Sequence, residues 1–217
     1  MVNNFKLSVG DVKYIINRQA YLNDLYHGKK WMHVLEVDGL KTSAMFEYIG
    51  EFGREIEGLW KHFGNCPINR EAALFELVDT VSYICSYYNF EDNLIEADQS
   101  EIDQIDITHF KHCDKPVIRN ILNNYVSVLA DHSSLIYCST LELITFVAVH
   151  LFLIDVSADQ FMLAYEKKSA LNMHRAMNGA VDGSYDKTNE NKPTVQLNEP
   201  CNALLSLINL SKGLSNE

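Results

Sequence analysis

The sequence contains few of the residues that interrupt helices. Its 217 residues include only four prolines and ten glycines, so long helices can form without a break. It also lacks an apolar stretch of membrane-spanning length, because Glu142 and His150 interrupt the longest one, residues 141–154. The N-terminal residues lack the apolar core of a secretory signal. With 47% hydrophobic residues, the composition favours an all-α protein with one sizeable core.

Paired cysteines and an excess of basic charge are missing as well. The five cysteines are odd in number and never spaced as Cys-x-x-Cys, which predicts reduced thiols in a cytoplasmic protein. The formal net charge of -11 argues against binding to nucleic acid. We therefore expect neither nucleic acid nor a membrane as partner. An acidic chain can still bind a phosphate compound if metal ions lie between the two.

The spacing of apolar residues predicts a bundle of about six main helices. They span approximately residues 11–25, 41–62, 69–88, 116–130, 140–154 and 157–178. A capping box formed by Ser157 and Gln160 begins the last of them. We expect residues 1–182 to form one all-α domain. Residues 183–217 are predicted to be a mobile polar tail, in which the apolar segment Ala203–Leu210 docks back on the domain.

Five acidic residues form two stripes on consecutive helices. Side chains three or four residues apart share one face of a helix. The second predicted helix carries Glu47, Glu51 and Glu55, and the third carries Glu76 and Asp79. A short loop joins these helices, so antiparallel packing would bring the stripes together. Carboxylate oxygens are ligands for magnesium or manganese. The alternative is two solvated acidic faces, and the spacing alone leaves both interpretations open.

The last helix presents a complementary basic face. Lys168, Asn172 and Arg175 are spaced four and three residues apart, so they project from one side. Lysine and arginine bind phosphate oxygens, and asparagine can bind a phosphate or a sugar hydroxyl. The alternative is an ordinary basic helix C-terminus, which the helix dipole favours.

Together these motifs resemble those of a known superfamily, the all-α NTP pyrophosphohydrolases. It includes MazG proteins, dCTP pyrophosphatases and dimeric dUTPases, and its metal motif is Glu-x-x-Glu on one helix and Glu-x-x-Asp on the next. The residues from Tyr165 to Arg175 are similar to the Tyr-x-Lys-Lys-x-x-x-Asn-x-x-Arg motif of the dUTPase branch, which includes phage dCTPase-dUTPases. Further similarities to that branch are Gln19, Asn23 and Trp31, which resemble the Gln, Asn and Trp of its N-terminal helix, and the cluster Trp60-Lys61-His62-Phe63. The resemblance covers most of residues 12–180 but not residues 90–138.

The resemblance implies a homodimer that cleaves a nucleoside triphosphate between the α and β phosphates. Glu47, Glu51, Glu55, Glu76 and Asp79 would bind magnesium, and Glu51 would accept a proton from the attacking water. Lys168 and Arg175 would stabilise charge on the phosphates. The residues expected to bind the substrate are Gln19, Asn23, Trp60, Lys61, Tyr83, Lys168, Asn172 and Arg175.

Two departures from the family pattern leave questions open. The family pairs its first two acids three residues apart, whereas Tyr48 lies three residues before Glu51. Either Glu47 takes over through a small helical shift, or Glu51 pairs with Glu55. Ser82 stands where the family often has histidine. We expect dUTP as the substrate, with dCTP or a purine nucleotide as the alternative. A nucleotide-binding protein without catalysis is the other alternative.

Overall fold

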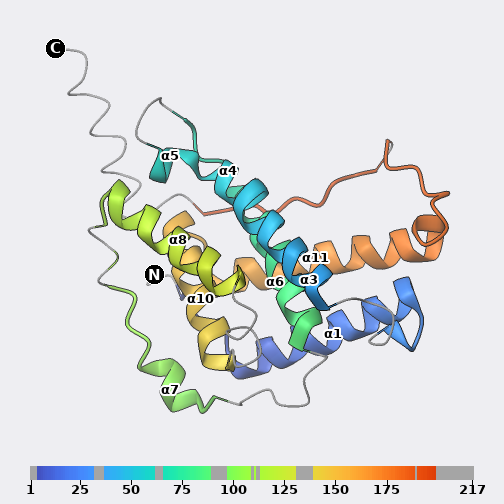
Figure 1. Cartoon of the computed structure of the whole chain (residues 1–217), viewed down its shortest axis with the longest axis horizontal. Coiled ribbons are helices and arrows are strands. Elements are labelled where there is room, and N and C mark those ends of the chain that lie inside the picture. Colours follow the sequence, from blue (N-terminus) through green and yellow to red (C-terminus); the bar gives the residue numbers. More distant parts are fainter. Residues whose placement is uncertain are drawn as a thin grey trace.

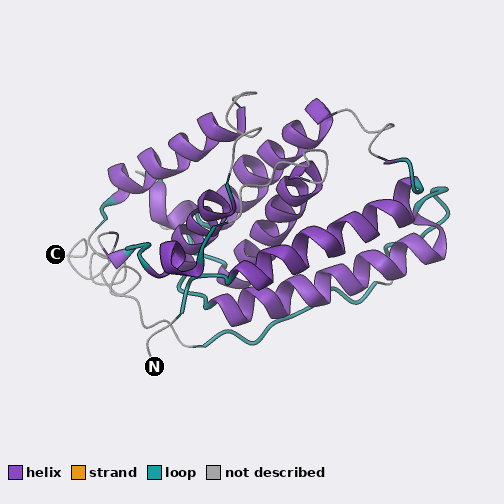
Figure 2. Ribbon diagram, turned by 90° about the horizontal axis from the view of Figure 1, so that it is seen from below, coloured by secondary structure: helices purple, strands orange, loops and turns teal. Residues whose placement is uncertain are grey.

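The computed structural model describes residues 4–31, 37–61, 66–88, 97–108, 110, 113–130, 139–188 and 190–198. Every regular element within these residues is a helix, which confirms the predicted all-α class (Figure 1, Figure 2). The α-helices of ten or more residues are α1 (Val9–His27), α3 (Val37–Phe46), α6 (Arg70–Tyr88), α8 (Lys115–Ala130), α10 (Thr140–Ile154) and α11 (Ala158–Arg175). A short helix, α7 (Gln99–Asp103), lies within residues 90–138, which the resemblance does not cover. The apolar segment Ala203–Leu210 lies outside the described residues.

Local capping sets the ends of the two helices that follow one another at the centre. Ser139 caps α10 through a box with Glu142, and Ser157 caps α11 through the predicted box with Gln160. Between them, Asp155 has a positive φ of 53°, which ends α10. The chain bends by 102° at this break. Among the described residues, no single helix has the length and apolar character needed to cross a membrane, and α10 meets that criterion only jointly with the bent segment that follows it.

The core lies around α6 and α10. α6 packs against α1, α3, α10 and α11, and its apolar side chains Leu74, Leu77, Val78 and Val81 are completely buried. α10 is buried on nearly all sides, which explains its almost continuous apolar sequence. Because α6 is central, its polar side chains face the interior space between helices rather than bulk solvent.

The second predicted helix is not continuous, which corrects the prediction of one helix over residues 41–62. α3 passes into a π-helical segment, η1 (Glu47–Phe52), followed by two short helices, α4 (Gly53–Glu55) and α5 (Glu57–Trp60). Gly58 lies directly against the carbonyl oxygen of Cys66, and a side chain there would collide with it. The returning chain therefore crosses α5 closely, and this tertiary contact accompanies the break.

The segment after α11 returns along the body of the protein. Residues 184–198 without residue 189, which we call the C-terminal strap, form an extended loop beside the helices (Figure 1, Figure 2). The buried Val195 donates its N–H to Oε1 of Glu71 at 2.7 Å. Nζ of Lys167 donates to the carbonyl of Thr194 at 2.6 Å. The strap is thus attached to α6 and α11, whereas its polar sequence predicted a mobile tail.

Candidate metal and nucleotide site

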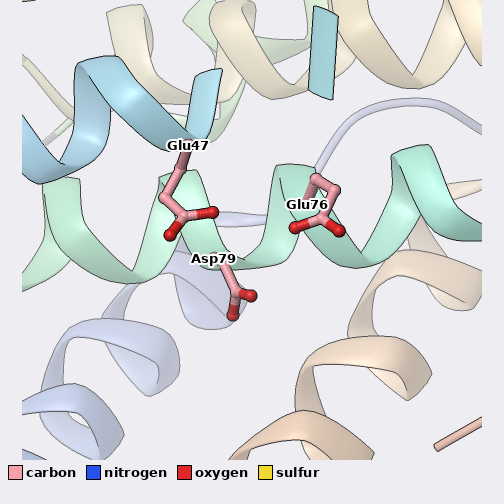
Figure 3. A group of neighbouring side chains, drawn as sticks. All are labelled: Glu47, Glu76 and Asp79. Atoms are coloured by element: carbon pink, nitrogen blue, oxygen red, sulfur yellow. The ribbon is translucent and has the colours of Figure 1, made fainter. Parts of the chain in front are cut away.

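Three of the five predicted acids meet between η1 and α6. Glu47 reaches across to α6, which carries Glu76 and Asp79 (Figure 3). One carboxylate oxygen from each residue lies within 4.8 Å of the other two. Glu47, at the start of η1, lies beside Asp79 in the middle of α6. Beyond the other end of η1, the carbonyl of Glu55 accepts from the N–H of Asn69, just before α6, at 3.0 Å. The two segments therefore run antiparallel. We call Glu47, Glu76 and Asp79 the acidic cluster.

The acidic cluster is electrostatically strained. Burial raises the pKa of Glu47 to about 7, and the charges of Asp79, Glu76 and Glu51 add to this rise. Burial and the charge of Asp79 also raise the pKa of Glu76. A bound cation would relieve the repulsion that raises these pKa values. The donors are carboxylate oxygens only, which fits magnesium or manganese rather than a metal that prefers nitrogen or sulfur.

Glu51 and Glu55 lie beside the cluster rather than in it. The guanidinium of Arg54 binds Oε2 of Glu51 at 2.5 Å and Oε1 of Glu55 at 3.3 Å. Both carboxylates still contribute to the raised pKa of Glu76, so they are close enough to act on it. The Glu51 side chain is 42% exposed, which leaves it accessible to water.

The first two acids, Glu47 and Glu51, lie on the π-helical segment. A π-helix contains more residues per turn than an α-helix, so it absorbs an extra residue and shifts the faces on either side. η1 begins at Glu47 and includes Glu51. Of these two acids, only Glu47 belongs to the acidic cluster.

The predicted basic face of α11 lies against this cluster. Nζ of Lys168 is 2.6 Å from Oδ2 of Asp79. Burial raises the pKa of Asp79, and the charge of Lys168 opposes that rise. Further along α11, Nη1 of Arg175 donates to Oδ1 of Asn172 at 3.1 Å. Arg175 also forms an ion pair with Glu190 of the strap.

A polar pocket of about 640 Å³ joins the two halves of the site. Glu47 and Asp79 of the acidic cluster line it. The predicted substrate-binding residues that line it are Gln19, Asn23, Tyr83, Lys168, Asn172 and Arg175. Its volume lies within the usual range for small-molecule sites. Residues from three separate predicted motifs therefore share one cavity.

The amide nitrogen of Asn23 is an unsatisfied polar atom in the pocket wall. Asn23 is 7% exposed, and Gln19 donates from Nε2 to its Oδ1 at 3.3 Å. Its Nδ2 is buried and has no hydrogen-bond partner among the described residues. An unpaired buried donor is costly, so a rotation that turned Nδ2 toward a ligand carbonyl in the pocket would be favourable.

Trp60 and Lys61, predicted to contact the substrate, do not line this pocket. The indole of Trp60 donates to the carbonyl of Gly53 at 2.8 Å, and its ring borders a separate, mainly apolar cavity of about 160 Å³ against α8. Lys61 is paired with Glu57 at 2.5 Å. After the break that follows α4, the chain runs toward α8. Trp60 and Lys61 are therefore separated from the acidic cluster of the same chain.

The pocket also contains residues that the sequence analysis did not predict to bind the substrate. Ser82 and Ser86 follow Asp79 at helical spacing on α6, so the periodicity could have identified them. Lys187 reaches the pocket from the strap, and Tyr26 from α1. No local pattern relates Lys187 to the distant helices, because its position depends on the return of the strap.

No protein-family model matches the chain, and no curated protein is significantly similar to it in sequence. The functional assignment therefore depends on the chemistry of the site.

Proposed function

We propose that the chain is a magnesium-dependent nucleoside triphosphate pyrophosphohydrolase of the all-α class. Within that class, we propose dUTP as its substrate. The observation that carries the proposal is the acidic cluster of Glu47, Glu76 and Asp79, of which Glu47 and Asp79 line a polar pocket together with Lys168 and Arg175. Carboxylates facing cations across a nucleotide-sized cavity suit a metal-bound polyphosphate.

Each part of the site has a role in this reaction. The acidic cluster holds magnesium, which when bound offsets the negative charge of the triphosphate. Glu51 accepts a proton from the attacking water, and its exposure gives water access to it. The water oxygen forms a bond to the α phosphorus, and the bond from that phosphorus to the α–β bridging oxygen breaks. Lys168 and Arg175 stabilise the negative charge on the departing pyrophosphate.

The base is bound at the other end of the pocket in this proposal. Nδ2 of Asn23 donates to a carbonyl of uracil, and Oε1 of Gln19 accepts from N3–H, since Gln19 already donates from its Nε2. Tyr83 forms part of the wall beside the base. Rotation of both amides would reverse this pattern and suit cytosine, so dCTP is the principal alternative substrate. A purine nucleotide is the next.

A second candidate function is nucleotide binding without hydrolysis. The observation that favours it is the pairing of two proposed catalytic groups with other side chains: Lys168 with Asp79, and Glu51 with Arg54. Turnover separates the two functions. A binding protein retains the nucleotide unchanged in the presence of magnesium, whereas an enzyme releases nucleoside monophosphate and pyrophosphate.

Metal removal and one pair of variants test the proposed function. EDTA should abolish hydrolysis, and excess magnesium should restore it. Glu76→Gln should lower kcat/KM on the order of 100-fold or more, because it removes a ligand charge from the acidic cluster. Glu57→Gln is the matched control, since Glu57 pairs with Lys61 outside the cluster. Equal activity of the two variants, or activity in EDTA, contradicts the proposal.

A further inference from the structure

The C-terminal strap places a carboxylate on the guanidinium of Arg175. Nε of Arg175 donates to Oε2 of Glu190 at 2.8 Å, and Nη2 donates to Oε1 at 2.5 Å. The hydroxyl of Tyr185 donates to Oε2 at 2.9 Å. The Glu190 side chain is 6% exposed and that of Arg175 is 20% exposed. Glu190 is therefore a partly buried carboxylate with three hydrogen bonds.

This arrangement leaves part of Arg175 available. A guanidinium has five N–H donors. Glu190 accepts two of them, and Oδ1 of Asn172 accepts a third. The remaining donors belong to Nη1 and Nη2, and Arg175 lines the pocket. The carboxylate thus fixes one edge of the guanidinium and leaves donors for a second anion.

The ion pair persists over the physiological pH range. Hydrogen bonding to Arg175, assisted by Tyr185, lowers the pKa of Glu190 to about 2. An anion that displaced Glu190 would break its two charge-assisted hydrogen bonds with Arg175, which is unfavourable. The geometry therefore favours a Glu190 that stays in place while a ligand binds.

We propose that Glu190 is a positioning residue, which holds Arg175 so that its remaining N–H groups point to the phosphates of the ligand. This inference rests on the proposed function, because it takes Arg175 as a phosphate-binding group. It makes the strap a part of the site, although the strap follows the helical domain in sequence. The other end of the strap is held independently, by Glu71 at Val195.

The two ends of the strap provide a matched pair of variants. Glu190→Gln removes the carboxylate charge at Arg175, and Glu71→Gln removes the charge that holds Val195. Binding of inorganic pyrophosphate with magnesium is measured by calorimetry, and circular dichroism verifies folding. Glu190→Gln should weaken binding about tenfold, because the guanidinium loses its orientation. Glu71→Gln should leave binding within about twofold. If Glu190→Gln does not fold, Tyr185→Phe is used in its place. It should weaken pyrophosphate binding by a smaller factor, but still by more than Glu71→Gln does.

A double variant tests whether Glu190 acts through Arg175. In an Arg175→Ala background, Glu190→Gln should cause no further loss of pyrophosphate affinity. Three results overturn the inference. Tighter pyrophosphate binding by Glu190→Gln would make Glu190 a competing anion, and equal losses of affinity in Glu190→Gln and Glu71→Gln would make the strap merely structural. The third result is that the unmodified chain does not bind pyrophosphate. Pyrophosphate binding without turnover of any nucleotide would contradict the proposed function and leave this inference intact.

Discussion

The ammonium group of Lys168 lies 2.6 Å from Oδ2 of Asp79. One residue comes from the basic face of α11 and the other from the acidic stripe of α6, 89 positions apart in the sequence. Both side chains are 19% exposed, so the contact is largely shielded from solvent. The cation expected to bind phosphate and the carboxylate expected to bind metal are thus direct neighbours.

Replacement of Lys168 should separate its role in the site from the general charge of α11. Lys168→Met should lower kcat by about 100- to 1,000-fold, because a cation that stabilises the departing pyrophosphate is lost. Lys167→Met is the matched control, since Lys167 binds the carbonyl of Thr194 on the strap. Its kcat should stay within about twofold. Similar kcat values for the two variants would exclude a specific role for Lys168.

Magnesium affinity should increase with pH because of Glu47. Its pKa is raised to about 7, so below that pH a proton competes with the metal. The affinity should rise by up to about tenfold per pH unit below pH 7 and then level off. For the metal-free protein, the stabilising contribution of protonated Glu47 is complete below its unfolded pKa near 4.5 and is lost as pH rises through 7.

Calorimetric titration of magnesium at pH 6 and pH 8 checks this dependence. Glu47→Gln should bind magnesium more weakly and with a smaller change between the two pH values. The same affinity at both pH values in the unmodified protein would show that Glu47 does not ligate the metal.

Acid should destabilise the core through His150. This histidine is completely buried, its Nδ1 donates to the carbonyl of Phe146 at 2.6 Å, and its Nε2 accepts from the hydroxyl of Tyr48 at 2.8 Å. Burial lowers its pKa from 6.5 to about 4. The contribution of neutral His150 to stability is therefore complete above pH 6.5 and declines toward pH 4, by roughly 3 kcal/mol at most.

Urea unfolding between pH 7.5 and pH 4.5 measures that decline. The double variant Tyr48→Phe with His150→Leu removes the titrating group and its partner together, so no buried polar atom of the pair is left. The free energy of unfolding of the variant should fall less between these pH values than that of the unmodified protein. Identical pH dependence in both would assign the acid sensitivity to other groups.

The sequence predicted the parts of the site that depend on local patterns. The range of α10 was predicted as residues 140–154, because a mainly apolar stretch follows Ser139. The basic face of α11 followed from the spacing of Lys168 and Arg175. The acidic residues were identified in the same way, since helical periodicity relates neighbours on one helix.

The remaining features depend on tertiary contacts that no local pattern contains. Glu47 rather than Glu55 belongs to the cluster, and the spacing alone could not distinguish the two. Trp60 lies against α8 because the chain breaks after Glu55, although its motif predicted a place near the substrate. The pairing of Glu190 with Arg175 requires the return of the strap, whose polar sequence is typical of a mobile tail.

Asn23 should control the choice of base. Asn23→Ala should lower kcat/KM for dUTP about tenfold and reduce the preference for dUTP over dCTP and dTTP, because the buried donor to the base is lost. Asn123→Ala on α8 is the control, since Asn123 borders the separate apolar cavity. Unchanged selectivity in Asn23→Ala would show that the first helix does not read the base.

Hydrolysis of a panel of nucleoside triphosphates, with identification of both products, tests the central claim most directly. The unmodified chain, incubated with magnesium and dUTP, dCTP, dTTP, dATP or dGTP, should release a nucleoside monophosphate and pyrophosphate. The value of kcat/KM should be highest for dUTP, by at least about tenfold over dCTP and dTTP. Comparable values for the pyrimidines would contradict the assignment to dUTP alone. A diphosphate with orthophosphate as products, or no turnover of any nucleotide, would contradict the pyrophosphohydrolase itself.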